Sequence, residues 1–130
     1  SIHMILAAEL GRTKQAYDFF RYMVRVDLDD YQKNTAQGLH MTPKSGTWMC
    51  MVYGWGGMRN DLDHLTFSPT IPTGWKGYRF RVVHRGSRIE ISVNRRKAAF
   101  KVLSGPRAKI AVYGKDYRIG PEGVEIPLVR

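Results

Sequence analysis

The chain has 130 residues, 43% of them apolar, which is enough for one modest globular domain with a core but not for two full domains. Its net charge of +10 is concentrated in the second half, because residues 61–130 carry 14 Lys and Arg against 6 Asp and Glu. No stretch approaches the roughly 18 consecutive apolar residues of a membrane helix, and no signal-peptide pattern occurs, so we expect a cytoplasmic protein without a membrane partner. The single cysteine, Cys50, lies in an apolar run and is expected to be buried rather than disulfide-bonded.

Two short helices are predicted at the start of the chain. Residues 2–10 carry apolar side chains at helical spacing, and Gly11 supplies a C-terminal stop. A second helix is predicted over residues 13–26, with Thr13 as its N-cap. Because the sequence begins without Met, just before or inside a helix, we expect it to be a fragment of a longer polypeptide.

A third helix is predicted after a polar loop. The loop, "DLDDYQKNTAQG", covers residues 27–38 and is rich in turn formers. Thr42 is then expected to cap a helix over residues 42–54, with Pro43 at its first position. Residues 48–53 are apolar on every side, which is typical of a helix that is buried all round.

The second half of the chain is expected to form antiparallel strands. After Gly56-Gly57 the spacing of apolar residues changes to two, and short turns separate the runs. The predicted strands are residues 78–86, 88–95, 98–105 and 108–115. They fit a sandwich or half-sandwich, with residues 67–75 as a connecting segment and residues 120–130 as an edge strand or a loose tail.

The start of the third helix has the chemistry of an anion site. Helix N-termini present unsatisfied N–H groups and the positive end of the helix dipole, and here we expect the free amides to come from Lys44, Ser45 and Gly46. Gly46 allows close approach to the backbone, the Ser45 hydroxyl is a further donor, and His40 lies on the entry loop. The same residues also fit an ordinary helix start, with His40 a hydrogen-bonded polar residue and Lys44 in solvent.

Four segments in this order resemble one known enzyme family. They are "SIHMILAAELG", "DLDDY", "GLHMTPKSGTWMCMVYGWGGMR" and "LTFSPTIPTGWKGYRFRVVHRGSRIEISV". Together they resemble, over roughly residues 1–119, the C-terminal end of glycoside hydrolase family 65, which includes maltose, trehalose and kojibiose phosphorylases. The resemblance implies an α+β chain, in which residues 1–57 are the last helices of an (α/α)6 catalytic barrel and residues 58–130 are a small antiparallel two-layer β domain.

The resemblance also implies a reaction and a phosphate site. In this family inorganic phosphate, a co-substrate rather than a cofactor, attacks the anomeric carbon of a disaccharide such as maltose or trehalose and releases β-glucose 1-phosphate with inversion. A single acid suffices because phosphate is already an anionic nucleophile. Phosphate is expected at His40, Ser45 and Gly46, with Lys44 and Thr47 as further candidates. The family's general acid, a glutamate, lies upstream, so no catalytic residue is expected in this chain.

Two alternatives stay open. The family usually has a small residue and a serine where this chain has Pro43 and Lys44, so a hydrolase of the same family is one alternative. The other is a stand-alone basic β module that binds an acidic partner. Because a partial barrel exposes apolar side chains such as Phe19, Phe20 and Met23, we also expect self-association or a homo-oligomer.

Other candidate residues have simpler interpretations. Asp27, Asp29 and Asp30 lack the glycine and closing glutamate of a calcium loop, so we expect capping or solvated charge and assign no metal. His84 is expected on the surface at a hairpin turn, and His3 is a candidate for the barrel interior.

The basic strands make nucleic acid a candidate partner that the strand pattern disfavours. Tyr78 and Phe80 alternate with Arg79 and Arg81, so strand geometry directs the rings and the charges to opposite faces. A stacking platform needs rings and cations on the same face. We therefore expect an ordinary amphipathic strand and no nucleic-acid partner.

Overall fold

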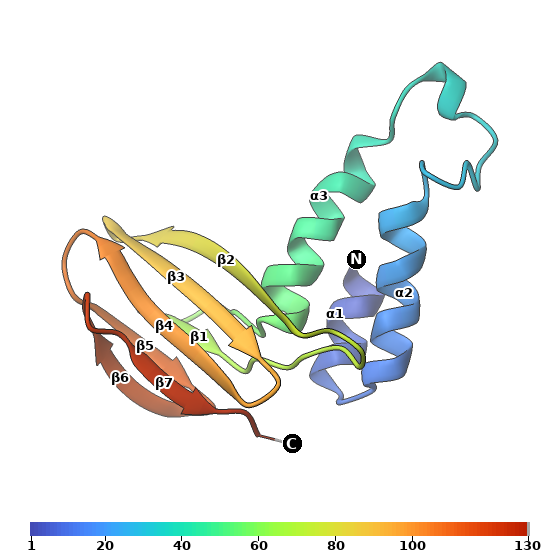
Figure 1. Ribbon diagram of the computed structural model, residues 1–130. Coiled ribbons are helices and arrows are strands. Elements are labelled where there is room, and N and C mark those ends of the chain that lie inside the picture. Colours follow the sequence, from blue (N-terminus) through green and yellow to red (C-terminus); the bar gives the residue numbers. More distant parts are fainter. Residues whose placement is uncertain (130) are drawn as a thin grey trace. The chain divides into compact units, whose positions relative to one another are not determined.

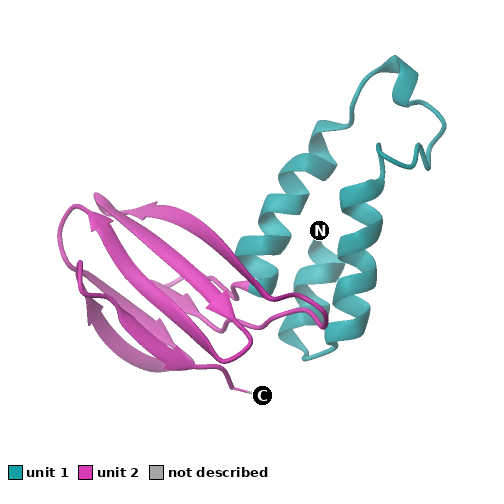
Figure 2. Cartoon of the chain, in the orientation of Figure 1, with its two compact units in different colours: residues 1–55 teal, residues 56–130 magenta. Residues whose placement is uncertain are grey.

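The computed structural model describes residues 1–129 (Figure 1). Contacts divide the chain into two compact units, Ser1–Trp55 and Gly56–Arg130 (Figure 2). The first unit is helical and the second consists of two small, mostly antiparallel sheets. The α+β fold class predicted from the sequence is therefore confirmed.

The first two helices form a hairpin. Helix α1 spans Ile2–Glu9 and helix α2 spans Thr13–Arg25, and the turn between them uses Gly11 at a φ of +70°, a conformation that glycine adopts without strain. Apolar side chains on the facing sides of both helices are buried: Met4, Ala7, Ala8, Ala16 and Phe20. The predicted cap is wrong, because Arg12 is the N-cap and the Thr13 hydroxyl donates to the Gly11 carbonyl at 3.4 Å.

The third helix begins earlier than predicted. Helix α3 spans Met41–Met49, continues as a π-helical segment over Cys50–Trp55, and has His40 as its N-cap residue in place of Thr42. Pro43 is tolerated at the third position because an amide there would have no carbonyl partner inside the helix. Trp48 is 51% exposed, so the helix is not buried all round in this chain. Cys50 is a buried free thiol, as predicted.

Two glycines let this helix pack closely on the other two. A Cβ atom added to Gly46 would lie 2.8 Å from Met23 Sδ, and one added to Gly54 would lie 2.5 Å from Met4 Sδ. Both distances are shorter than an ordinary van der Waals contact, so the missing side chains set how near the helices approach.

Within the described residues, the β unit forms seven strands in two sheets. Its strands are β1 (Leu65–Phe67), β2 (Gly77–His84), β3 (Ser87–Asn94), β4 (Lys97–Ser104), β5 (Ala108–Val112), β6 (Lys115–Ile119) and β7 (Val124–Pro127). The larger sheet is fully antiparallel in the order β2-β3-β4-β7. The smaller sheet has the order β1-β5-β6, in which β1 is parallel to β5 and β6 is antiparallel to it.

Strands β1, β5 and β6 differ from the sequence prediction, whereas β7 agrees with it. The predicted strand 108–115 ends at Val112, and a turn at Tyr113-Gly114 leads directly into β6. Strand β5 also leaves the antiparallel series and pairs with β1, a three-residue strand that was predicted only as part of a connection. In the tail, residues Val124–Pro127 form an edge strand on β4, which confirms one of the two predicted outcomes.

The core of the β unit follows the predicted alternation. Strand β3 buries Ile89, Ile91 and Val93 and exposes the residues between them in part or in full. Phe100 on β4 packs against Phe67 on β1 with ring centroids 5.0 Å apart, which joins the two sheets. On β2, Tyr78 is buried and Arg79 is exposed, so rings and charges lie on opposite faces as predicted.

Two turn glycines allow a matched test of the β unit. Gly105 has a φ of +90°, and an added Cβ would lie 2.1 Å from the Gly86 carbonyl oxygen, whereas Gly114 has a φ of +78° with no atom within 4 Å. Gly105→Ala is expected to lower the free energy of unfolding by about 3 kcal/mol or more, from strain plus a backbone clash. Gly114→Ala should cost only about 1 kcal/mol. Equal losses in urea unfolding of the two variants would contradict this packing.

Candidate functional site

A buried carboxylate lies between helix α2 and helix α3. Asp27 follows the last turn of α2, and its side chain is 2% exposed. Its Oδ1 accepts a hydrogen bond from Nδ1 of His40 at 2.6 Å, and its Oδ2 accepts one from the backbone N–H of His40 at 3.1 Å. The ammonium group of Lys44 also donates to Oδ2. We call Asp27, His40 and Lys44 the α3 N-terminal cluster.

The electrostatics of this cluster keep Asp27 ionised. The hydrogen bond from Lys44 contributes most, and with the bonds from His40 it outweighs burial and lowers the pKa of Asp27 from 3.8 to about 2. A carboxylate that is ionised can only accept hydrogen bonds, so Nδ1 of His40 carries a proton. The second ring nitrogen, Nε2, is left for other partners.

The cluster presents two nitrogen groups near the helix start. The side chain of His40 is 30% exposed and that of Lys44 is 43% exposed. Because the helix begins at Met41, its free amides are those of Met41 and Thr42, and Pro43 has none. The prediction that Lys44, Ser45 and Gly46 supply free amides is therefore wrong: all three lie past the first three helical residues, where amides bond to the carbonyls of the preceding turn.

The remaining predicted phosphate residues lie on the following turn. Ser45 is exposed and its hydroxyl donates to the Met41 carbonyl at 3.4 Å. Thr47 donates to the Pro43 carbonyl at 2.7 Å. Gly46 is buried against Met23, so the packing of helices alone accounts for a glycine there. The structure thus brings together His40 and Lys44, with Ser45 as an exposed neighbour.

Sequence reasoning missed the role of Asp27. The three aspartates of the loop were expected to cap or to remain solvated, and this holds for Asp30, which accepts from the backbone N–H groups of Asn34 and Thr35. Asp29 instead pairs with Arg25, and Asp27 is buried. Asp27 and His40 are 13 residues apart in an irregular loop, so no periodic pattern connects them. Among residues 1–129, no group of three or more His, Cys, Asp and Glu side chains is placed to hold a metal ion.

The other two histidines of interest are not members of this cluster. His3 is exposed on α1 and its ring lies 5.8 Å from that of Phe19. His84 ends strand β2 beside the hairpin turn and is partly exposed, with its Nε2 atom turned inward and buried. Within the described residues, the helices are all too short or too polar to cross a membrane.

The buried carboxylate predicts a specific acid sensitivity. The pKa of Asp27 is lower in the folded state, so the unfolded chain binds the proton first, and acidification favours unfolding between about pH 4 and pH 2. Wild type should be more stable than Asp27→Asn at neutral pH, by a margin that is constant above about pH 5 and shrinks between about pH 4 and pH 2. Urea unfolding followed by circular dichroism measures this margin.

The matched control for this prediction is Asp18→Asn. Asp18 lies on an exposed part of α2, where it pairs with Lys14 at 3.0 Å. An exposed pair of this kind contributes little to stability, so the control should unfold close to wild type. A stability difference between wild type and Asp27→Asn that does not change with pH would contradict the assignment of Asp27 as a buried, ionised carboxylate. A difference no larger than that of Asp18→Asn would contradict it as well.

Comparisons with known protein families account for most of the chain. The profile of the glycosyl hydrolase family 65 central catalytic domain matches residues 1–49, and that of the family 65 C-terminal domain matches residues 58–119. The chain is 37% identical over 118 residues to an alpha,alpha-trehalose phosphorylase of Geobacillus stearothermophilus, covering 91% of this chain and 15% of that protein. It is 36% identical over 113 residues to a maltose phosphorylase of Bacillus subtilis, covering 87% of this chain and 15% of that protein.

A solved structure has the same fold. A putative kojibiose phosphorylase from the human microbiome superimposes with a TM-score of 0.92 at 34% identity, over 99% of this chain and 19% of that one. The chain thus spans about 15% of the length of the curated relatives named above. Both profiles and these relatives agree with the resemblance found in the sequence. The chain belongs to glycoside hydrolase family 65, of which it contains the end of the catalytic domain and the C-terminal β domain.

Proposed function

We propose that this chain is the C-terminal portion of an inverting disaccharide phosphorylase. In the proposed reaction, inorganic phosphate attacks the anomeric carbon of an α-glucoside such as maltose or trehalose and gives β-glucose 1-phosphate and glucose. The names of the relatives, trehalose, maltose and kojibiose phosphorylase, support this class of reaction. Residues 1–57 would complete the catalytic barrel, and residues 58–130 would form a structural β domain.

The observation that carries the proposal is the α3 N-terminal cluster. A phosphate ion needs donors and positive charge held at a fixed geometry. The buried carboxylate of Asp27 orients the ring of His40 and holds the ammonium of Lys44 beside the start of a nine-residue helix. The free amides and the dipole of that helix favour an anion at the same place.

Each group has a proposed role in the reaction. His40 donates from Nε2 when its ring carries both protons, and Lys44 has two N–H groups besides the one directed at Asp27. Ser45, which is exposed, adds a hydroxyl on the next turn. These contacts would hold phosphate for in-line attack, while protonation of the leaving group requires an acid that the family places upstream of these residues.

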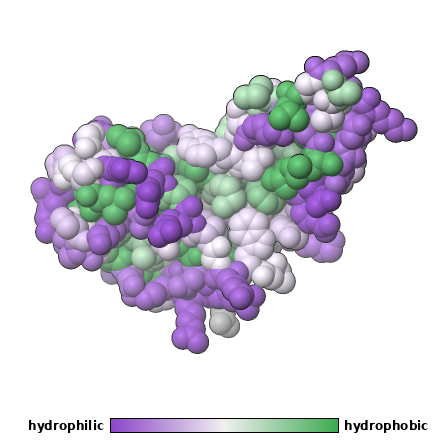
Figure 3. Space-filling view, turned by 45° about the horizontal axis from the view of Figure 1, so that its top comes forward, coloured by the Kyte–Doolittle hydropathy of each residue, from purple (hydrophilic) through white to green (hydrophobic). Residues whose placement is uncertain are grey.

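The exposed apolar side chains of the helical unit agree with its being part of a larger assembly (Figure 3). Large apolar residues that are half or more exposed in this unit are Ile2, Leu6, Leu10, Tyr22, Leu28, Leu39, Met41 and Trp48. Of the three residues expected to be exposed, Phe19 is 39% exposed and Met23 is partly exposed, but Phe20 is buried. Exposed apolar surface of this extent favours a covering partner, either the rest of the barrel or a second copy.

The proposal is tested in a full-length family 65 enzyme that carries this segment. His40→Gln and Lys44→Gln each remove one charged or polar contact to phosphate, and kcat/KM for phosphate should fall about ten- to hundredfold. As a control, Lys14→Gln makes the same charge change as Lys44→Gln, at an exposed position of α2. It should leave kcat/KM for phosphate unchanged. Initial rates at varied phosphate, with saturating disaccharide, measure these values.

Two results would contradict the proposal. An unchanged kcat/KM for phosphate in both His40→Gln and Lys44→Gln would remove the cluster from the phosphate site. Release of free glucose from both halves of the disaccharide in phosphate-free buffer, at the rate seen with phosphate, would instead identify a hydrolase. The departure at Pro43 and Lys44 from the usual family pattern makes this second measurement necessary.

A further inference from the structure

The larger sheet ends on one side in a long strand that nothing in its sequence blocks. In the order β2-β3-β4-β7, the two outer strands are β2, with eight residues, and β7, with four. Strand β7 carries Pro127, which has no N–H group, whereas β2 contains no proline and pairs with β3 without a bulge. Natural sheets usually shorten, bend or block an edge of this length, and an open edge is a template for a further strand.

Every second residue of β2 directs its backbone away from β3. The β2–β3 turn closes with His84 opposite Ser87, the pair that a two-residue turn joins by hydrogen bonds. Bonded and non-bonded pairs alternate along an antiparallel ladder, so the N–H and C=O groups of Arg79, Arg81 and Val83 point to the outer edge. All three residues are exposed, and within residues 1–129 no backbone hydrogen bond outside the ladder reaches them.

The inner face of the sheet is incompletely covered at this edge. Phe80 and Val82 on β2 are partly exposed, whereas their ladder partners on β3, Ile91 and Ile89, are fully buried. A strand added beside β2 would place its own side chains next to Phe80 and Val82 and would remove their exposed surface from water. The inner side of the edge therefore suits apolar residues in a partner strand.

The two arginines of β2 do not protect the edge. A charged side chain that extends past an edge strand discourages pairing with another chain. Here both guanidinium groups are drawn back over the sheet to Glu90 on β3. Arg81 Nε donates to this carboxylate at 2.8 Å, and Arg79 Nη1 lies 4.0 Å from it. The backbone at the edge is therefore left open.

The outer face of the sheet beside this edge carries an excess of positive charge. Arg79 and Arg81 share the single carboxylate of Glu90. Lys101 lies opposite the same glutamate on β4, and Arg88 is the next outer-face residue of β3. Within the described residues, neither Lys101 nor Arg88 has an ion pair within 4.0 Å. Four cations thus surround one carboxylate, and acidic residues in a partner strand would complement them.

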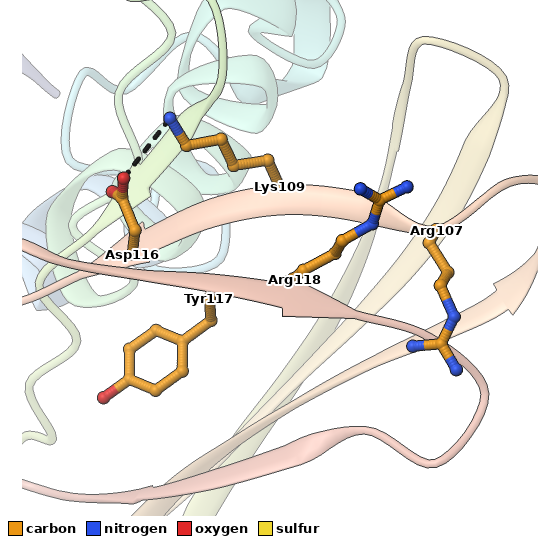
Figure 4. A pocket seen from close by; sticks show the side chains of 5 residues that line it. All are labelled: Arg107, Lys109, Asp116, Tyr117 and Arg118. Atoms are coloured by element: carbon orange, nitrogen blue, oxygen red, sulfur yellow. Dashed lines mark ion pairs between the residues drawn. The ribbon is translucent and has the colours of Figure 1, made fainter.

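Two other pairings are less favourable. If two copies of β2 paired antiparallel with the greatest overlap, the arginines of one copy would lie opposite those of the other, and like charges in this position destabilise a sheet. The edge of the smaller sheet, β6, has only five residues and carries charges of both signs. Figure 4 shows Asp116 of β6 paired with Lys109 of β5 at 3.3 Å, next to Arg118.

We propose that the outer edge of β2 binds an extended acidic segment of another polypeptide, which joins the larger sheet as an antiparallel strand. Its acidic residues would lie on the outer face beside Arg79 and Arg81, and the apolar residues between them on the inner face beside Phe80 and Val82. Backbone hydrogen bonds to Arg79, Arg81 and Val83 would supply affinity. The inference concerns the β unit alone and does not depend on the proposed phosphorylase reaction.

The test uses the 130-residue chain and a short synthetic peptide in which glutamate alternates with valine. Amide hydrogen exchange followed by ¹H–¹⁵N spectra measures each N–H group of β2 separately. In the chain alone, the N–H groups of Arg79, Arg81 and Val83 should exchange fast and those of Phe80 and Val82 slowly. The peptide should slow exchange at the first three residues, saturably, and leave the other two nearly unchanged.

Modified peptides test the hydrogen bonds and the charge. In antiparallel pairing, the peptide residues on the same face as Arg79 and Arg81 exchange both backbone bonds with β2. N-methylation of the glutamates should therefore abolish binding, whereas N-methylation of the valines, whose N–H groups face away, should preserve it. A peptide with lysine in place of glutamate is expected to bind at least about tenfold more weakly, because its charge has the same sign as that of the sheet.

Substitutions in the chain separate strand pairing from folding. Val83→Pro removes an N–H group that the β3 ladder does not use, so the β unit should stay folded while peptide affinity falls about tenfold or more. Arg81→Gln should weaken peptide binding about two- to fivefold at low salt. Arg118→Gln removes an exposed arginine from β6 instead, and as the matched control it should bind the peptide as wild type does.

Three results would overturn the proposal. The first is hydrogen exchange at Arg79, Arg81 and Val83 that the peptide does not slow. The second is equal binding of both N-methylated peptides, which would mean attraction of charge without a strand ladder. The third is slow exchange at these residues without peptide that becomes slower as the chain concentration rises, which would place a second copy of the chain at the edge.

Discussion

The helical unit depends on one buried negative charge. Asp27 accepts hydrogen bonds from the backbone and ring of His40 and from the ammonium of Lys44, and it thereby joins the end of α2 to the start of α3 across an irregular loop. A buried carboxylate without these partners would be costly, so the loop, the ring and the lysine are held together as a set. The direction of His40 Nε2 and the place of Lys44 both follow from this constraint, and so does the proposed phosphate site.

The β unit is arranged by a different kind of constraint, which is backbone geometry at its turns. Gly105 lies so close to the Gly86 carbonyl that a side chain would not fit, and this contact brings the β2–β3 turn beside the start of β5.

Much of the fold could be predicted because local patterns carry it. Strand alternation placed Tyr78 inside and Arg79 outside, and helical spacing located α1 and α2 to within one or two residues. The partition of β5 into the second sheet could not be predicted, because parallel pairing with β1 joins residues far apart in the sequence and β1 has only three residues. The start of α3 was misplaced by two residues, because Thr42 and Pro43 match the residues favoured at an N-cap and a first helical position, whereas both lie inside the first turn.

The site was predicted in part for a similar reason. His40 and Lys44 are four residues apart around a helix start, and a pattern of that length can be seen in a sequence. Asp27 organises them through hydrogen bonds across 13 and 17 residues, and the burial of its carboxylate is a tertiary property. Gly46 was assigned to ligand approach, whereas its contact with Met23 shows that packing alone requires a small residue.

The most direct measurement of the central claim is a crystal structure of a full-length family 65 enzyme carrying this segment, with inorganic phosphate bound. The account predicts a phosphate ion within hydrogen-bond distance of His40 Nε2 and Lys44 Nζ at the start of α3, with Asp27 still bonded to both residues. Phosphate bound elsewhere in the catalytic domain, with His40 and Lys44 making no contact to it, would contradict the account.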